Sequence, residues 1–377
     1  MRAGLLALGL GTFAVGTDSF VLAGMLPQVA RSLHVGIPVA GQAVIAYALV
    51  HALLSPAVVA ALRWPSKPVM LTGLALLVLG NLLTALAPGF GLVVACRILA
   101  AVGGAVFLPI GTITAVSTVP PDRRGLALTT IRGGSTAAAA LGIPVGVAFA
   151  TLADWRLAMY LTASLGALAA AGVALLTPGI PAAPPIHPAR GLSPLRDWRI
   201  GHTLLMATVL FCGLLTPYTY AAAGLFSPGL PLALLLSTWG TAALAGTLLS
   251  TRLTDRLGSR RLIRLASLTA LATLTLTPLS AHHLPLALAT TLAWGFAGAV
   301  LTVPIQHRLI TYKPAAAPFS ILLTSTTSYL ALALAATLGA LLLTFTTPTT
   351  LCLTAATLIA CALALDSPRR HLRLASA

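Results

Sequence analysis

The chain has 377 residues, of which 7% are charged and 58% are hydrophobic, and its mean hydropathy is +0.98. Soluble domains carry roughly 25% charged residues, so this composition excludes a water-soluble globular protein and indicates a protein embedded in a lipid bilayer. The formal net charge of +16 does not indicate nucleic-acid binding. The basic residues lie in short gaps between apolar runs, not on one face interleaved with aromatic residues.

Apolar runs long enough to cross a bilayer as helices, which takes about 20 residues, recur along the whole chain. The first run resembles a signal peptide, but it is long, contains Asp18 and is followed by further runs, so we interpret it as a span. We therefore predict an all-α polytopic membrane protein of about 12 spans, at 4–26, 38–60, 68–88, 90–113, 125–150, 157–177, 200–222, 230–251, 262–281, 285–305, 317–343 and 347–365.

The distribution of Lys and Arg predicts the orientation of the spans. With the N-terminus in the cytoplasm, the inner segments hold 18 of the 22 basic residues, and the outer segments hold only Arg31 and Arg156. Cytoplasmic loops of membrane proteins are enriched in Lys and Arg. We therefore predict a multi-pass protein of the cell membrane with both termini in the cytoplasm.

A break in hydropathy and an internal repeat predict two halves. Residues 178–199 are rich in Pro and Ala and indicate a cytoplasmic linker between six-helix bundles at 1–177 and 200–377. Residues 104–110 in the fourth span resemble residues 298–305 in the tenth, at an offset of 194 to 195 residues. Repeated six-span halves are a known transporter design, with substrate bound near the bilayer midplane between the halves.

Four segments resemble the twelve-span drug:proton antiporters of the major facilitator superfamily, a group that includes bacterial chloramphenicol exporters and arabinose-efflux-type permeases. These segments are 16–27, 96–101, 141–146 with 154–156, and 255–261. The resemblance implies the fold of that superfamily and proton-coupled efflux, by alternating access, of a small, mostly uncharged amphipathic compound such as a chloramphenicol-like antibiotic. A sugar or metabolite exporter of the same superfamily is the alternative.

The resemblance also implies roles for two groups of motif residues. Gly142, Pro144 and Gly146 in the fifth span resemble the antiporter motif, where small residues permit close helix packing and Pro permits a hinge. Plain packing is the alternative. Asp255, Arg256 and Gly258 resemble a loop motif that gates the inner face. The first-half copy of that loop is degraded, because Ala61 stands where the second half has Asp255.

Ionisable residues deep in the spans are few, and each is costly at a helix centre, by about 2.5–3.5 kcal/mol for Asp or Arg. At 1.5 Å per residue, Asp18 and Arg97 both lie roughly 4–6 Å to the outer side of their span centres, so they could pair. They form either a titrating proton-coupling site or a structural ion pair. His51 is a second coupling candidate or a packing residue. Arg132 contacts a substrate anion or extends along a cavity wall.

Aromatic side chains in the second half are candidate substrate contacts or packing residues, and those we single out are Tyr218, Tyr220, Trp294 and Tyr329. Such a surface suits an uncharged amphipathic compound. The chain contains no Glu, and its only Asn is Asn81, which disfavours a sugar site.

Other chemistry is not indicated. The four cysteines, Cys96, Cys212, Cys352 and Cys361, lie inside apolar runs without metal-ligand spacing and are predicted to be small buried hydrophobes. We expect no metal, no cofactor and a monomer. A membrane-embedded transferase is disfavoured because the outer loops are short, and a non-transporting receptor is the remaining alternative.

Overall fold

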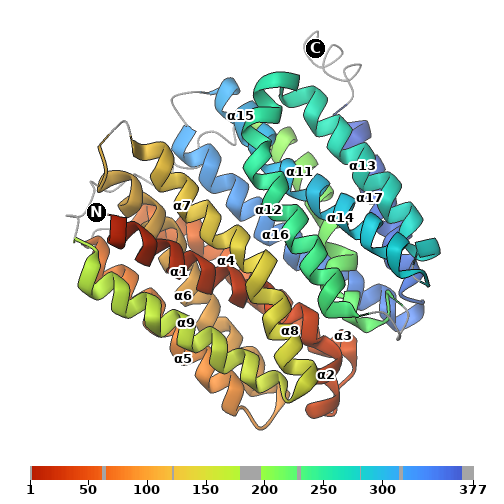
Figure 1. Cartoon of the computed structure of the whole chain (residues 1–377), viewed down its shortest axis with the longest axis horizontal. Helices are drawn as coiled ribbons and strands as arrows, with labels where there is room; N and C mark the ends of the chain where they lie inside the picture. The colour runs from red at the N-terminus through yellow and green to blue at the C-terminus, as the bar shows by residue number, and fades with distance from the viewer. Residues whose placement is uncertain are drawn as a thin grey trace.

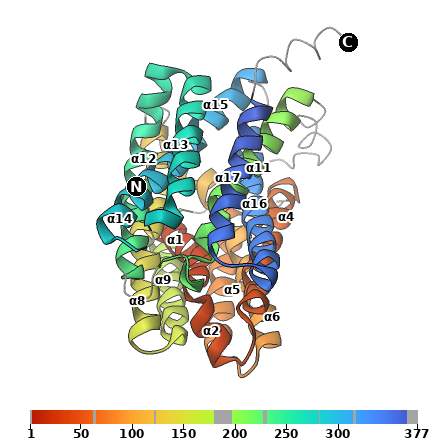
Figure 2. The same cartoon turned by 90° about the vertical axis from the view of Figure 1, so that its right-hand side faces the viewer.

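The structure is a computed structural model that describes residues 2–61, 65–120, 123–178, 197–226, 231–280, 282–313 and 317–366. All regular secondary structure in these residues is helical. The helices form two bundles side by side, one built from the first half of the chain and one from the second (Figures 1 and 2). Most of the predicted linker at 178–199 lies outside the described residues.

The first bundle contains α1 to α9. Its first span is interrupted by a 3-10 turn at Ala23–Met25, and its fifth by a π-helical segment at Ala138–Gly142. Its α-helices are α1 Arg2–Val21, α2 Leu26–Ser32, α3 Ile37–Ala40, α4 Gln42–Ala61, α5 Ser66–Leu86, α6 Phe90–Ser117, α7 Arg124–Ala137, α8 Ile143–Leu152 and α9 Trp155–Leu176.

The second bundle contains α11 to α17. A 3-10 turn at Ala221–Ala223 follows its first helix, and its tenth span is divided at Leu301. Its α-helices are α11 Trp198–Thr219, α12 Leu232–Leu257, α13 Ser259–Ser280, α14 Leu284–Val300, α15 Thr302–Tyr312, α16 Ala317–Phe345 and α17 Thr349–Leu365.

The structure confirms the predicted all-α polytopic class. Eleven helical segments of the described residues are long and apolar enough to cross a membrane. The predicted twelfth span is the apolar helix α17, which has 17 residues and a length of about 26 Å. The first and tenth spans run on to Ser32 and Tyr312, further than the hydropathy indicated.

The same three residues start the last helix of the first bundle and the first helix of the second. Asp154 precedes Trp155 and Arg156, and Asp197 precedes Trp198 and Arg199. In each case the Asp carboxylate accepts a hydrogen bond, at 3.0 Å, from the backbone N–H of the Arg two residues later. This N-cap satisfies a backbone donor that the helix itself leaves unpaired.

Helices α5, α9, α13 and α17 lie at the periphery and pack mainly within their own bundle. They present large exposed leucines, including Leu86, Leu175 and Leu279, as helices in contact with lipid do. Cys96, Cys212 and Cys352 are buried as predicted. The prediction is wrong for Cys361, which is exposed on α17, because an apolar run alone does not tell which face of a helix is covered.

The two bundles meet along two main interfaces. In one, α4 packs on α16, and in the other α12 packs on α8 and on the π-helical segment. At the repeat offset of 194 to 195 residues, α4 corresponds to α12 and the span of α7 and α8 corresponds to α16. The two interfaces are therefore copies of each other, as a two-fold repeat requires.

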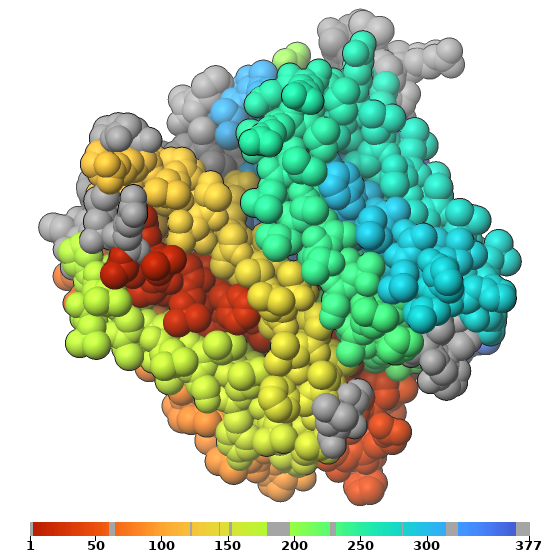
Figure 3. Space-filling model, in the orientation of Figure 1, coloured from red at the N-terminus to blue at the C-terminus, as the bar shows by residue number. Residues whose placement is uncertain are grey.

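Contact between the bundles is uneven along their length. We name the end where α1, α5, α7 and α13 begin the basic end. At the opposite end, the 3-10 turns Ala23–Met25 and Ala221–Ala223 meet, and α3 contacts α16. Figure 3 shows α8 against α12, whereas the start of α7 and the end of α12 lie apart at the basic end.

Candidate functional site

Asp18 and Arg97 form an ion pair between α1 and α6. The Arg97 Nη1 atom lies 2.6 Å from Asp18 Oδ1, and Nη2 donates to the Asp18 backbone carbonyl at 2.8 Å. Asn81 of α5 accepts a further hydrogen bond from Nη1 at 3.2 Å. The Asp18 and Arg97 side chains are 0% and 1% exposed, so each charge depends on the other in place of water. The structure thus brings together the two residues that were predicted to match in depth.

Ser19 and Tyr47 connect this ion pair to the second bundle. The Arg97 guanidinium lies 4.5 Å from the centre of the Tyr47 ring, on α4. The hydroxyl of Ser19, the residue after Asp18, lies 3.3 Å from the Tyr47 hydroxyl and 3.1 Å from the hydroxyl of Tyr329 on α16. A short polar path therefore leads from the ion pair across the interface between the bundles.

His51 lies beside this path. Its ring stacks on the Tyr329 ring with 3.7 Å between the ring centres and an angle of 19° between the planes. Both ring nitrogens are buried and have no hydrogen-bond partner among the described residues. The described residues therefore provide no hydrogen bond through which His51 and Asp18 exchange a proton. We name these six side chains the coupling cluster: Asp18, Ser19, Tyr47, His51, Arg97 and Tyr329.

Tyr218 and Trp294 belong to a group of aromatic rings between α1 and the second bundle. The centre of the Tyr218 ring lies 4.4 Å from that of Trp239, 6.4 Å from that of Trp294 and 6.0 Å from that of Phe20. The indole N–H groups of Trp239 and Trp294 are buried and unpaired among the described residues. This group forms part of the wall between the bundles.

Tyr220 takes no part in the ring contacts that the other predicted aromatic residues make among the described residues. Its ring is fully buried, and its hydroxyl donates to the backbone carbonyl of Ala336 at 2.7 Å. The hydroxyl also fills the space beside Gly41, and the ring fills the space beside Gly339, so a Cβ atom on either glycine would overlap the Tyr220 side chain. These contacts are those of a packing residue, one of the two interpretations that the sequence left open.

Arg132 lines a cavity of about 270 Å³ between the bundles, toward the basic end. Of the predicted substrate residues it is the one found in this cavity wall. Its Nη2 atom donates a short hydrogen bond to the side-chain carbonyl of Gln306, on α15. At the repeat offset, Gln306 corresponds to Thr112 and Thr302 corresponds to Leu108, and all four line the cavity.

Gly142, Pro144 and Gly146 lie where the fifth span is irregular. The π-helical segment Ala138–Gly142 precedes α8, and Pro144 stands in the first turn of that helix. A Cβ atom on Gly142 would overlap the Thr17 side chain, and one on Gly146 would overlap Val21. Both glycines thus allow this span to pack closely on α1, the helix that carries Asp18.

Asp255, Arg256 and Gly258 end α12 at the basic end. Gly258 closes the helix with a φ of 75°, a conformation that side chains with a Cβ rarely adopt. Asp255 and Arg256 are exposed, and neither has an ion pair among the described residues. Their role in bracing the inner gate therefore stays a prediction.

Sequence reasoning missed a second buried carboxylate, Asp366, directly after α17. It is 1% exposed, accepts a short hydrogen bond from Arg308 Nη1, and lies 3.4 Å from Arg264 Nε. Its partners precede it by 58 and 102 residues, so no local spacing in the sequence could reveal the contact. This cluster joins the ends of α13, α15 and α17 at the basic end.

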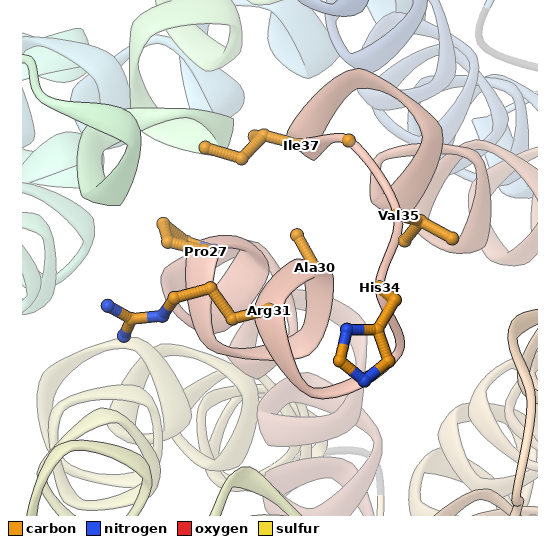
Figure 4. A pocket seen from close by; sticks show the side chains of 7 residues that line it. Pro27, Ala30, Arg31, His34, Val35 and Ile37 are labelled. Carbon is orange, nitrogen blue, oxygen red and sulfur yellow. The ribbon is translucent and has the colours of Figure 1, made fainter.

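A second hollow lies on the surface at the turn between α2 and α3 (Figure 4). It is lined by Pro27, Arg31, His34 and their neighbours, and the Arg31 guanidinium extends away from the His34 ring. The two side chains do not converge on one point, so the hollow is not a candidate binding site.

Comparisons with known proteins agree with this architecture. The structure superposes on that of a point mutant of the nucleoside transporter NupG with a TM-score of 0.76, covering 96% of this chain and 98% of that one at 13% sequence identity. At this identity the match shows the shared fold alone.

Curated relatives are bacterial membrane transporters. A chloramphenicol resistance protein of Streptomyces lividans is 30% identical over 265 residues, 67% of either chain. The uncharacterized transporter YfhI of Bacillus subtilis is 33% identical over 168 residues, and that match spans 44% of this chain and 42% of YfhI. The sequence profile of the Major Facilitator Superfamily matches residues 8–336. This multi-pass chain therefore belongs to the Major Facilitator Superfamily of membrane transporters.

Proposed function

We propose that the chain is a proton-coupled exporter of a small, mostly uncharged amphipathic compound of the chloramphenicol kind. It exchanges the compound for protons by alternating access, in the bacterial plasma membrane and with both termini in the cytoplasm. The two halves at 1–177 and 200–377 move against each other around the cavity, and the segment 178–199 links them. Because both halves of one chain line the cavity, a monomer is sufficient.

The observation that carries this proposal is the buried pair of Asp18 and Arg97. Among the described residues, Asp18 is the only acidic residue in the interior of a span, since Asp255 lies at the end of α12, and a carboxylate without water persists there because Arg97 balances it. Removing one charge of a buried pair leaves the other uncompensated and costs about 3–5 kcal/mol. Protonation of Asp18 therefore changes which position of Arg97 is most stable, and a proton gradient biases that change.

The polar path through Ser19 gives this change a route to the second bundle. Ser19 follows Asp18 on α1, and its hydroxyl lies within hydrogen-bonding distance of Tyr329 on α16. A shift of α1 at Asp18 moves Ser19 with it, because one helix carries both residues. The contact with Tyr329 then differs between the two protonation states, which is what a coupled transporter requires.

The asymmetric contact between the bundles fits one state of the cycle. The bundles touch at the end opposite the basic end, and the cavity lies toward the basic end. With the basic end in the cytoplasm, this is the state that takes up its compound from inside the cell. The name of the Streptomyces relative and the apolar character of the aromatic wall support a chloramphenicol-like compound.

The test is Asp18→Asn, which keeps the shape of the side chain and imitates its protonated form. Transport of chloramphenicol into inverted membrane vesicles is measured with and without an imposed proton gradient. We expect the variant to equilibrate the compound yet lose its gradient-driven accumulation. Accumulation equal to that of the wild type would exclude Asp18 as the coupling site and leave His51 as the next candidate.

A drug-susceptibility panel in an efflux-deficient bacterial host tests the substrate class. The wild-type chain should protect the host against chloramphenicol-like compounds, and Asp18→Asn should not. Protection confined to sugars or sugar-like inhibitors would favour the metabolite exporter instead.

A further inference from the structure

The cavity between the bundles has an unbalanced charge. Helices α6 and α7 supply its wall in the first half, and α12, α14, α15 and α16 supply it in the second. Among the described residues, Arg132 is the one charged side chain in this wall. The other polar side chains are the amide of Gln306 and the hydroxyls of Thr112, Ser135, Thr136, Thr247, Thr302 and Ser325.

No acidic side chain of the described residues faces Arg132. The chain has six acidic residues, and none of those that the structure describes lines the cavity. Asp18 is closed off by Arg97, Asp366 is held by Arg264 and Arg308, and Asp255 is exposed at the end of α12. The two aspartates before α9 and α11 cap those helices, and the sixth, at position 122, lies outside the described residues. A ligand in the cavity therefore meets a positive potential.

Most N–H donors of the Arg132 guanidinium have no hydrogen-bond partner among the described residues. Its one hydrogen bond among the described residues runs from Nη2 to Gln306 Oε1, and a guanidinium carries five N–H donors. Gln306 is an uncharged partner, so its hydrogen bond to Arg132 lacks the attraction between opposite charges that a carboxylate would add. A carboxylate that accepts two parallel hydrogen bonds from the guanidinium would compete with the Gln306 carbonyl for Nη2, whereas a cation would meet the like charge of Arg132.

From this geometry we infer that Arg132 determines which compounds the transporter accepts. It binds an anionic oxygen acceptor on an amphipathic substrate, such as a carboxylate, and it rejects permanent cations. This inference rests on the proposed function in one respect, since it takes the cavity to be where the exported compound binds. It adds a charge rule for the substrate that the proposed function does not contain.

The experiment measures binding to the purified full-length protein without a gradient. Three probes share an aromatic body and differ in charge: 4-nitrobenzoate, 4-nitrobenzyl alcohol and 4-nitrobenzyltrimethylammonium. Equilibrium dialysis gives a Kd for each. In the wild type we expect 4-nitrobenzoate to bind most tightly and the ammonium probe most weakly. An ammonium probe that binds as tightly as 4-nitrobenzoate would overturn the inference.

Two variants separate selectivity from structural support. Arg132→Gln should weaken 4-nitrobenzoate by about 10- to 100-fold, the size expected for a lost hydrogen bond to a charged group, and the ammonium probe should not weaken. Gln306→Ala frees the guanidinium and should tighten 4-nitrobenzoate. Arg252→Gln removes a charge outside the cavity wall, so it is the control and should leave the preference unchanged. An Arg132→Gln protein that weakens all three probes equally would contradict the inference, as would an unchanged preference in Gln306→Ala.

The outcomes also distinguish this inference from the proposed function. A wild-type protein that prefers 4-nitrobenzoate but accumulates nothing under a proton gradient keeps the inference and refutes proton-driven export. A protein that exports chloramphenicol but binds all three probes alike keeps the proposed function and refutes the inference.

Discussion

At the scale of single residues, Tyr329 is the side chain through which the second bundle touches the coupling cluster. Tyr329→Phe removes only the hydroxyl near Ser19 and keeps the ring that stacks on His51. A typical hydrogen bond contributes about 0.5–1.5 kcal/mol, so we expect gradient-driven transport in vesicles to fall by about two- to tenfold. Substrate binding without a gradient should be unchanged.

Tyr220→Phe is the matched control for this substitution. It removes a buried tyrosine hydroxyl of the same bundle, whose partner is a backbone carbonyl outside the coupling cluster. This variant should lower the Tm in detergent and leave transport per folded molecule intact. Equal losses of transport in both variants would mean that Tyr329 acts only as a packing residue.

Asp366 is expected to stabilise the second bundle. Asp366→Asn leaves the largely buried guanidinium of Arg308 without its carboxylate, and losing one partner of a buried pair costs about 3–5 kcal/mol. Arg264 is 39% exposed, so it adds little to this loss. We expect a Tm several degrees lower, measured by thermal unfolding of the purified protein.

The same change at Asp255 provides the comparison. Asp255 is exposed and has no ion pair among the described residues, so Asp255→Asn should unfold at the wild-type temperature. Its transport rate then tests the predicted gating role separately. A lower Tm for Asp255→Asn together with an unchanged Tm for Asp366→Asn would mean that Asp255, and not Asp366, stabilises the fold.

These residues show which features of the site could be predicted from the sequence. Depth along a helix follows from counting residues, so Asp18 and Arg97 could be matched in depth from the sequence alone. Rotation about the helix axis and long-range partners do not follow from counting. The different contacts of Tyr220 and Tyr218, the stack of His51 on Tyr329, and the partners of Asp366 all depend on those two quantities.

At the scale of elements, the π-helical segment Ala138–Gly142 and the glycines at its end and after it set how closely the fifth span approaches α1. Gly142→Ala would press a methyl group into Thr17, and overpacking of this kind costs about 1–3 kcal/mol. We expect a lower Tm and slower transport, because the displaced Thr17 directly precedes Asp18 on α1.

Gly125→Ala in α7 is the matched control for this span. Its Cβ position has no neighbour within 4 Å, and Ala favours a helix over Gly by up to about 1 kcal/mol, the value for a helix interior. Stability should therefore stay level or rise, with transport unchanged. Equal effects of the two substitutions would argue against a close approach at Gly142. The small residues and the proline in this segment predicted close helix packing and a hinge. A π-helical turn has no characteristic composition, so it could not be predicted from the sequence.

At the scale of the whole molecule, the charge bias predicts which end faces the cytoplasm. In a background without its four native cysteines, Arg190→Cys should resist a membrane-impermeant thiol reagent added to intact cells, and His283→Cys should react. Labelling at both positions after the cells are opened controls for reactivity. Reaction of residue 190 from outside would invert the orientation and, with it, the direction of the proposed uptake.

The fold at this scale was the most predictable part. Span lengths and apolar composition follow from the thickness of the bilayer, and a repeat in sequence becomes a repeat in packing, as the paired contacts of α4 with α16 and α8 with α12 show. The relative tilt of the bundles was not predictable, because it depends on side-chain contacts between helices that lie far apart in the sequence.

Among the described residues, Asp18 is the single carboxylate in the interior of a span, and this sets a limit on how much work the transporter can do. If Asp18 carries the proton, each cycle moves one positive charge inward against one neutral molecule outward. One pH unit across the membrane then supports at most about a tenfold concentration ratio. A potential of 100 mV supplies about 2.3 kcal/mol per charge and multiplies that ratio by about 50. Export would therefore be driven more by the membrane potential than by the pH difference. It would persist without a pH difference for as long as the membrane stays polarised.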